Sequence, residues 1–345
     1  MTCQRTVFSA RDLRPHLKLL GRTRLLDAGL ELSWSASGFA LRVTASRLVL
    51  RFADYVGADA ACAPVCVRVS CDTHTQKFVI NGHTPCILFD DLGERPVTVT
   101  VLRVSEGDLP LYLTDLELWG VSPTIGLPPP PSARRMLFLG DSLTCGYGTD
   151  SRPGDTVFHT WEEDVTHAFA YLTAEALEAD YQIVSVSGQG ITRNCNGEHG
   201  VLVSEFWDRA RRGDLSAADE SGFVPQIIVV NGGTNDCNGK CPAEELILGF
   251  DALIDRLHAA FPRAHVVLAY GLCEETFVPV QRDLVERRRA AGDGRVRFCR
   301  LPSIHDGVLP DAAGCNWHPT TASHQRAAAV LIGFLRETVL PEVEP

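Results

Sequence analysis

The amino-acid sequence predicts a two-domain protein, with an all-β domain followed by an α/β domain. The 345 residues are more than one compact core usually needs. A run of four prolines, Pro128 to Pro131, forms a semi-rigid spacer between two stretches of different hydrophobic pattern. Apolar residues alternate with polar ones before this run, whereas continuous apolar segments alternate with helical segments after it.

Short alternating segments recur through the first 122 residues. We expect strands at 30–34, 40–45, 47–52, 67–70, 77–80, 97–103 and 112–118, because β-branched and aromatic residues at a period of two are typical of half-buried strands. Several short strands of this kind predict an antiparallel β-sandwich or jelly roll. We assign residues 1–122 to this accessory domain and 123–134 to a proline-rich linker.

Residues 135–345 show a different order of elements. We expect strands at 136–139, 182–186, 226–231 and 265–270, and helices at 166–178, 243–261, 277–291 and 320–338. Apolar strands that alternate with amphipathic helices form a parallel sheet that is covered on both faces. The sequence therefore predicts a three-layer α/β/α domain in this range.

Polar segments follow the predicted strands or precede the last helix. They are GDSLTCGYG (140–148), SGQG (187–190), NGGTND (231–236) and CNWHPT (315–320). In an open α/β sheet the functional site lies at the carboxyl ends of the strands. We therefore expect these four segments to meet at one edge of the sheet.

In this order the four segments resemble the sequence blocks of the SGNH (GDSL-type) hydrolases. The resemblance covers 135–345 and implies a serine esterase with Ser142 as nucleophile and His318 as base. A serine hydroxyl needs a base to remove its proton during attack, and a neutral imidazole is suited to that task. Taken alone, Ser142 is equally suited to cap a helix, and His318 is an ordinary loop histidine. The resemblance makes Asp141 and Asp236 structural supports of their loops.

A tetrahedral intermediate also requires hydrogen-bond donors for its oxyanion. The predicted donors are the Ser142 N–H, the N–H of Gly188 or Gly190, and the side-chain amide of Asn235. Gly188 aligns better with the glycine of the family. Without the resemblance, Asn235 is better read as part of a turn.

The usual acid of the triad is missing. The family pattern has aspartate three residues before the histidine, where this chain has Cys315, and the position two before it holds Asn316. We therefore expect a Ser142–His318 dyad whose imidazole is oriented by a main-chain carbonyl near Asn316. Asp306 and Asp311 are the alternative acids.

A β-sandwich before an SGNH domain, together with the local sequence around these blocks, resembles carbohydrate esterase family two. This resemblance implies removal of O-acetyl groups from xylan or mannan fragments. A sugar site needs an aromatic platform, and the candidates are Trp317, Trp161 and Trp207. Tyr147 is expected to be a packing residue. A sugar-binding role for the N-terminal domain, through Trp34 and Trp119, stays open beside a structural role.

Two other functions remain possible from the sequence: a lipase or thioesterase of the same superfamily, and a degenerate carbohydrate-binding protein. The formal net charge of −11 argues against nucleic-acid and anionic-membrane partners. No cofactor or metal is expected, because the twelve cysteines lack zinc-site spacing. The N-terminus lacks a signal-peptide pattern, so we expect a cytoplasmic protein, or a secreted one if the sequence is truncated. The oligomeric state is not readable from the sequence.

Overall fold

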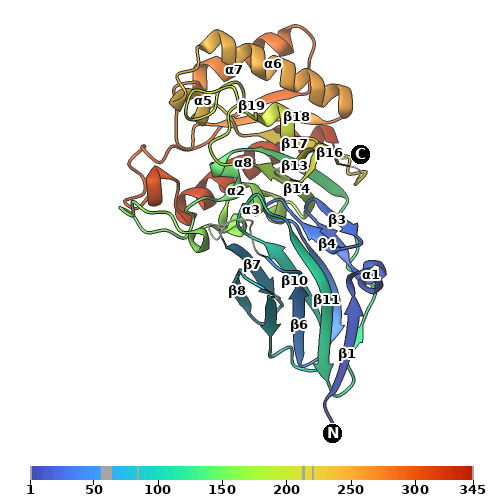
Figure 1. The fold of residues 1–345 in the computed structure, drawn as a ribbon. Coiled ribbons are helices and arrows are strands. Elements are labelled where there is room, and N and C mark those ends of the chain that lie inside the picture. The colour runs from blue at the N-terminus through green and yellow to red at the C-terminus, as the bar shows by residue number, and fades with distance from the viewer. Residues whose placement is uncertain (1, 56–63, 84, 212–213, 220, 344–345) are drawn as a thin grey trace. The chain divides into compact units, whose positions relative to one another are not determined.

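The computed structural model describes residues 2–55, 64–83, 85–211, 214–219 and 221–343 (Figure 1). The chain divides into two compact units. One consists of residues 1–131 with 209–221, and the other of residues 132–208 with 222–345. Within the described residues, no helix has the length and apolar character needed to cross a membrane.

The first unit contains two six-stranded antiparallel sheets. The first sheet consists of β1 (Gln4–Ser9), β3 (Thr23–Leu26), β4 (Gly29–Leu32), β6 (Arg47–Phe52), β9 (Cys86–Phe89) and β11 (Leu111–Gly120). Its strand order is β3-β4-β11-β6-β9, and β1 also pairs with β11. The second sheet consists of β2 (Lys18–Leu20), β5 (Gly38–Thr44), β7 (Val65–Ser70), β8 (Thr75–Ile80), β10 (Pro96–Arg103) and β12 (Thr124–Ile125). Its strand order is β12-β5-β10-β7-β8, and β2 also pairs with β5. Its helical turns are short: α1 (Ala10–Leu13) and η1 (Arg14–His16).

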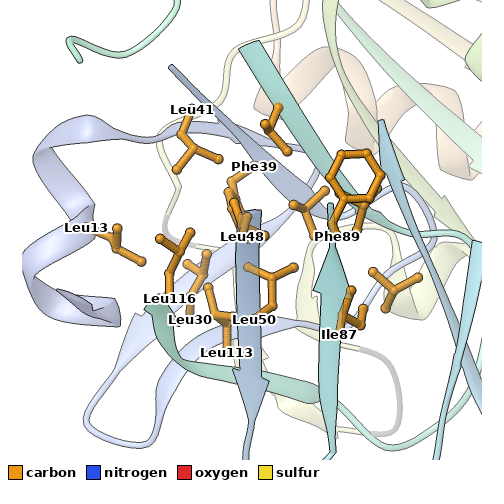
Figure 2. Close-up of a cluster of buried hydrophobic side chains, with 14 of the residues drawn as sticks. Leu13, Leu30, Phe39, Leu41, Leu48, Leu50, Ile87, Phe89, Leu113 and Leu116 are labelled. Carbon is orange, nitrogen blue, oxygen red and sulfur yellow. The ribbon is translucent and has the colours of Figure 1, made fainter. Parts of the chain in front are cut away.

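The core of this unit is built from the inward-facing side chains of both sheets (Figure 2). Phe39 of β5 and Leu48 of β6 are both fully buried in the same cluster, with Phe89 of β9. Along β10 the burial alternates as the sequence pattern requires, with Val97, Val99 and Val101 buried. The predicted β-sandwich is confirmed.

A short hairpin from later in the chain belongs to the first unit. It consists of β15 (Arg209–Arg211) and β16 (Asp214–Ala218), although these residues fall inside the range 135–345 that we assigned to the α/β domain. The buried indole of Trp34 donates to the Arg209 carbonyl at 3.2 Å. Asp219 forms an ion pair with Arg22 at 3.1 Å, and the Arg22 side chain is 3% exposed. A buried guanidinium requires an anionic partner, and this segment supplies it.

Both residues considered for sugar binding by the first unit, Trp34 and Trp119, make contacts within the protein. Trp34 is 1% exposed and therefore presents no face to a ligand. Trp119 lies under the guanidinium of Arg5, 5.7 Å from its ring centroid, and its indole N–H donates to Glu117. Thr124 and Ile125, inside the predicted linker, form β12.

The second unit contains a five-stranded parallel sheet in the order β14-β13-β17-β18-β19. Its strands are β13 (Arg134–Gly140), β14 (Ala179–Ser185), β17 (Ile227–Val230), β18 (His265–Tyr270) and β19 (Val296–Arg300). The helical elements are α2 (Ser142–Cys145), η2 (Thr160–Glu162), η3 (Val165–His167), α3 (Phe169–Ala176), α4 (Val203–Phe206), α5 (Thr234–Asn238), α6 (Ala243–Ala260), α7 (Val278–Ala290), η4 (Cys315–Trp317), α8 (Thr321–Thr338) and α9 (Leu340–Val343). Helices α3 and α8 lie on one side of the sheet, and α6 and α7 on the other (Figure 1).

This strand order places a topological switch point at β13, because the chain continues to β14 on one side and returns to β17 on the other. Ligands of open α/β sheets bind at such a point, beyond the carboxyl ends of the strands. The segment that begins at Gly140 starts at the last residue of β13, and the segment that begins at Asn231 follows β17 directly. The fold therefore brings the first and third polar segments to neighbouring strand ends.

Candidate active site

Ser142 and His318 are hydrogen bonded to each other. The Ser142 Oγ lies 2.8 Å from the His318 Nε2. Ser142 is the first residue of α2, which Asp141 caps by accepting a hydrogen bond from the Leu143 N–H. His318 ends the turn η4 and lies just before α8. Two segments 176 residues apart in the chain thus place a hydroxyl and an imidazole within reach of proton transfer.

The other imidazole nitrogen contacts the main chain. The His318 Nδ1 lies 3.1 Å from the Asn316 carbonyl oxygen. A carbonyl only accepts hydrogen bonds, so Nδ1 carries the proton and Nε2 is left to accept from the Ser142 hydroxyl. This is the tautomer that a general base needs. The structure thus places at Nδ1 the kind of partner that we expected in place of an acid.

The alternative acids have other contacts. The Asp306 carboxylate is paired with Arg326 at 2.6 Å and also accepts from the Val308 N–H, and these interactions lower the pKa of Asp306. Asp311 is exposed, and its main-chain carbonyl accepts from the Thr320 hydroxyl. Neither carboxylate takes the position at Nδ1 that the Asn316 carbonyl occupies.

The two glycines proposed as oxyanion donors differ in how their N–H groups are used. The Gly190 N–H donates to Asn194 Oδ1 at 3.1 Å. A Cβ at Gly190 would lie 1.8 Å from the Arg193 carbonyl oxygen, so this glycine is needed for close packing of its loop. By contrast, the N–H groups of Ser142 and Gly188 have no hydrogen-bond acceptor among the residues that the structure describes. The geometry therefore favours Gly188 over Gly190 as the glycine donor.

Asn235 joins the loops that carry these two donors. Its Nδ2 lies 2.9 Å from Asp141 Oδ2 and 2.9 Å from the Gln189 carbonyl oxygen. Asp141 precedes Ser142, and Gln189 follows Gly188. Both amide hydrogens of Asn235 are therefore engaged in this resting structure, so the amide must share one of them to serve an oxyanion.

Asp141 and Asp236 differ in their surroundings. Asp236 accepts hydrogen bonds from the N–H groups of Ile191, Thr192 and Arg193, and so organises that loop. Asp141 is 1% exposed. Burial, reinforced by the negative charge of Asp236, raises the pKa of Asp141 to about 7. Both carboxylates contact loop backbone, as expected of supports.

The three tryptophans proposed for substrate binding lie in different environments. Trp317 is 73% exposed and, next to His318, lines a pocket of about 190 Å³ together with Asp155 and Thr156. Trp161 is 50% exposed and stacks on His159.

Trp207 is 6% exposed. Its ring packs edge-on against Phe261, with Arg256 over its face. Trp207 is therefore a packing residue in this structure, contrary to the expected substrate role. It lies at the end of α4, where its indole completes an apolar contact with the region after α6.

Two residues near the base were not recognised as part of the site from the sequence. The ring of Tyr147, which we expected only to pack, lies 4.3 Å from the His318 ring, between centroids. The Ser151 hydroxyl accepts from the Cys315 N–H at 2.7 Å. No sequence signal links residue 151 to residue 315, because the contact arises only from the tertiary fold.

A nucleophilic hydroxyl, an imidazole in the basic tautomer and unengaged backbone donors define a serine hydrolase type of site, at the switch point of an α/β/α sheet. The chain belongs to the GDSL-like lipase/acylhydrolase family, whose model matches residues 138–326.

Two curated relatives support the assignment to this family. The cellulase/esterase CelE of Acetivibrio thermocellus is 30% identical over 218 residues, which is 60% of this chain but only 26% of CelE. An acetylxylan esterase/glucomannan deacetylase of Cellvibrio japonicus is 28% identical over 335 residues, covering 94% of this chain and 89% of that protein. The chain thus spans about a quarter of one curated relative and most of the other.

Solved structures share the fold of most of the chain. A family two carbohydrate esterase from Clostridium thermocellum, in complex with cellohexaose, has a TM-score of 0.82 at 23% identity and covers 93% of this chain and 98% of its own. The acetyl xylan esterase Est2A of Butyrivibrio proteoclasticus has a TM-score of 0.85 at 20% identity, with coverage of 96% and 98%.

Proposed function

We propose that this protein is a serine esterase that removes O-acetyl groups from oligosaccharides. The observation that carries the proposal is the Ser142–His318 pair at 2.8 Å, with the tautomer of His318 set by the Asn316 carbonyl. The names of the relatives support the acetylated sugar as substrate: one is called an acetylxylan esterase/glucomannan deacetylase. Acetylated fragments of xylan and mannan are the substrates to test first.

The proposed reaction has two stages. The Ser142 Oγ attacks the acetyl carbonyl carbon while its proton passes to His318 Nε2, and the negative charge of the tetrahedral intermediate is stabilised by the N–H groups of Ser142 and Gly188. When the intermediate collapses, the bond to the sugar oxygen breaks and that oxygen takes the proton from His318. The acetyl group stays on Ser142.

In the second stage His318 takes a proton from water, and the oxygen of that water attacks the acetyl-enzyme. Collapse of the second intermediate releases acetic acid, which ionises to acetate in solution, and the proton passes from His318 back to the Ser142 oxygen. Removing one oxyanion donor in such a site costs about 2.7–4 kcal/mol of transition-state stabilisation. The Asn316 carbonyl stays bonded to Nδ1–H throughout and stabilises the imidazolium of each intermediate less than a carboxylate does.

The substrate side of the site contains an exposed aromatic face next to the base. Trp317 is 73% exposed, and an indole face is suited to pack against the apolar face of a pyranose. Asp155, which lines the same pocket, offers carboxylate oxygens to sugar hydroxyls. These features support binding of the sugar on the Trp317 side of His318.

The test is acetate release from 4-nitrophenyl acetate and from acetylated xylo- and manno-oligosaccharides. We expect activity on all three and a loss of about 10⁴-fold or more in Ser142→Ala. A matched variant, Ser303→Ala, removes another buried serine hydroxyl and should keep activity. Faster turnover of octanoyl than of acetyl esters would indicate a lipase instead. Binding of oligosaccharides without acetate release would indicate a carbohydrate-binding protein.

A further inference from the structure

The base of this site depends on a main-chain carbonyl for its orientation. The Asn316 carbonyl is a neutral acceptor, so it holds the imidazole less strongly than a carboxylate does. A 1 Å misplacement of a catalytic group can lower a rate by about 100-fold. The contacts that fix the Asn316 carbonyl are therefore as important to the base as the carbonyl itself.

The turn that presents this carbonyl has an unfavourable backbone. Asn316 has φ 50° and ψ 37°, and Trp317 has φ 60°. The left-handed region costs a residue other than glycine roughly 1–2 kcal/mol, less for asparagine. Two such residues in succession do not hold this conformation by local preference. Contacts from outside the turn must stabilise it.

The first such contact is the buried hydroxyl of Ser151. Ser151 is 7% exposed, and its Oγ accepts from the Cys315 N–H at 2.7 Å and donates to the Gly148 carbonyl at 2.6 Å. The approach is close, since a Cβ at Gly314 would lie 2.3 Å from this oxygen. Ser151 thus fixes the first residue of the turn η4.

The second contact is Tyr147, from the same loop. Its phenolic oxygen accepts from Asn316 Nδ2 at 3.0 Å. Its ring lies 4.3 Å from the His318 ring and 3.8 Å from the Phe158 ring, between centroids. Its N–H donates to the Ser142 carbonyl at 3.0 Å. Tyr147 therefore contacts the nucleophile's helix, the base and the residue that orients the base.

We propose that Ser151 and Tyr147 are positioning residues that hold the Asn316 carbonyl against His318 Nδ1, where a triad would have an acid. In this role they act through the turn 315–317 and the imidazole, which they contact directly. The inference rests on the proposed esterase function for its kinetic readout, but the orientation of His318 can be observed without any substrate.

The experiment compares Ser151→Ala and Tyr147→Phe with two matched controls. Ser303→Ala removes a hydroxyl that accepts a backbone N–H in another loop, and Tyr171→Phe removes a phenol in α3. For each variant we would measure kcat and KM with 4-nitrophenyl acetate, the melting temperature, and the tautomer of His318 by ¹⁵N NMR of the imidazole.

We expect kcat to fall about 10- to 100-fold in Ser151→Ala and about 3- to 10-fold in Tyr147→Phe, with KM within twofold of wild type. The Nδ1–H tautomer of His318 should lose population in both. The double variant should lose less than the product of the two single effects, because both act through one carbonyl. The controls should retain wild-type kcat and tautomer.

Wild-type kcat and an unchanged His318 tautomer in both variants would overturn the inference. If Ser151→Ala does not fold, Tyr147→Phe still tests it, because this change keeps the ring and removes one oxygen. A wild-type protein that releases no acetate would overturn the proposed function alone, and the NMR measurement would still decide the positioning role.

Discussion

Asp141 offers a test of the electrostatics beside the nucleophile. Its carboxyl is fully buried, and burial raises its pKa from 3.8 to about 7. Between these two values the native state keeps a proton that the unfolded chain releases. The native state therefore binds more protons, and its stability falls as the pH rises, by about 1.4 kcal/mol per pH unit. Below pH 3.8 both states are protonated and this contribution is constant.

The variant Asp141→Asn removes the ionisation and keeps the shape. We would measure urea unfolding of both proteins from pH 5.5 to 8.5. Relative to the variant, wild type should lose about 2 kcal/mol between pH 5.5 and 7 and little above pH 7.5. The quantity compared is the change with pH of the difference in unfolding free energy between the two proteins. The hydrogen bond that Asn235 loses in the variant contributes equally at each pH and therefore cancels. Parallel stability curves for the two proteins would refute a carboxyl that titrates near neutrality.

Four further predictions concern three residues of the site and one packing residue. Asn316→Asp should not raise kcat more than about threefold, because this side chain faces the Tyr147 hydroxyl while the main chain contacts the base; a larger gain would mean that the new carboxylate reaches the imidazole. Trp317→Ala should raise KM for acetylated oligosaccharides and leave 4-nitrophenyl acetate kinetics unchanged; a wild-type KM for the oligosaccharides would contradict this. Trp207→Ala should lower the free energy of unfolding in urea by about 3–5 kcal/mol, and wild-type stability would contradict that. Asn235→Ala should lower kcat about 100-fold at pH 8, whether the amide donates directly or spaces the two loops, and wild-type kcat would exclude both roles.

The sequence was sufficient to predict a strand or helix whose own residues show a clear hydrophobic pattern. Continuous apolar runs predicted four of the five parallel strands, but β19, with the sequence VRFCR, has arginines in its pattern and was missed. In the first unit, β2 and β12 are only three and two residues long, too short for any period to show. The predicted helix 166–178 is divided, because Ala168 is extended at ψ 150° between η3 and α3.

Site residues were predictable when they lie inside a motif and not when a tertiary contact defines them. Ser142 and His318 lie in such motifs, and the missing aspartate pointed to a carbonyl near Asn316. Which glycine keeps its N–H unengaged depends on the Asn194 side chain, which the sequence does not place. The burial of Trp207 likewise depends on Phe261, a partner 54 residues further along the chain.

The hairpin at 209–218 has a consequence for how this protein can be divided. The chain passes between its two units three times, after residues 131, 208 and 221. A fragment that ends in the proline run would leave Arg22 without its ion pair to Asp219 and Trp34 without its bond to the Arg209 carbonyl. Loss of one partner of a buried pair costs about 3–5 kcal/mol. The first unit therefore needs residues 209–221 in order to be complete. We expect the two units to be inherited, and to be transferable to other proteins, only together.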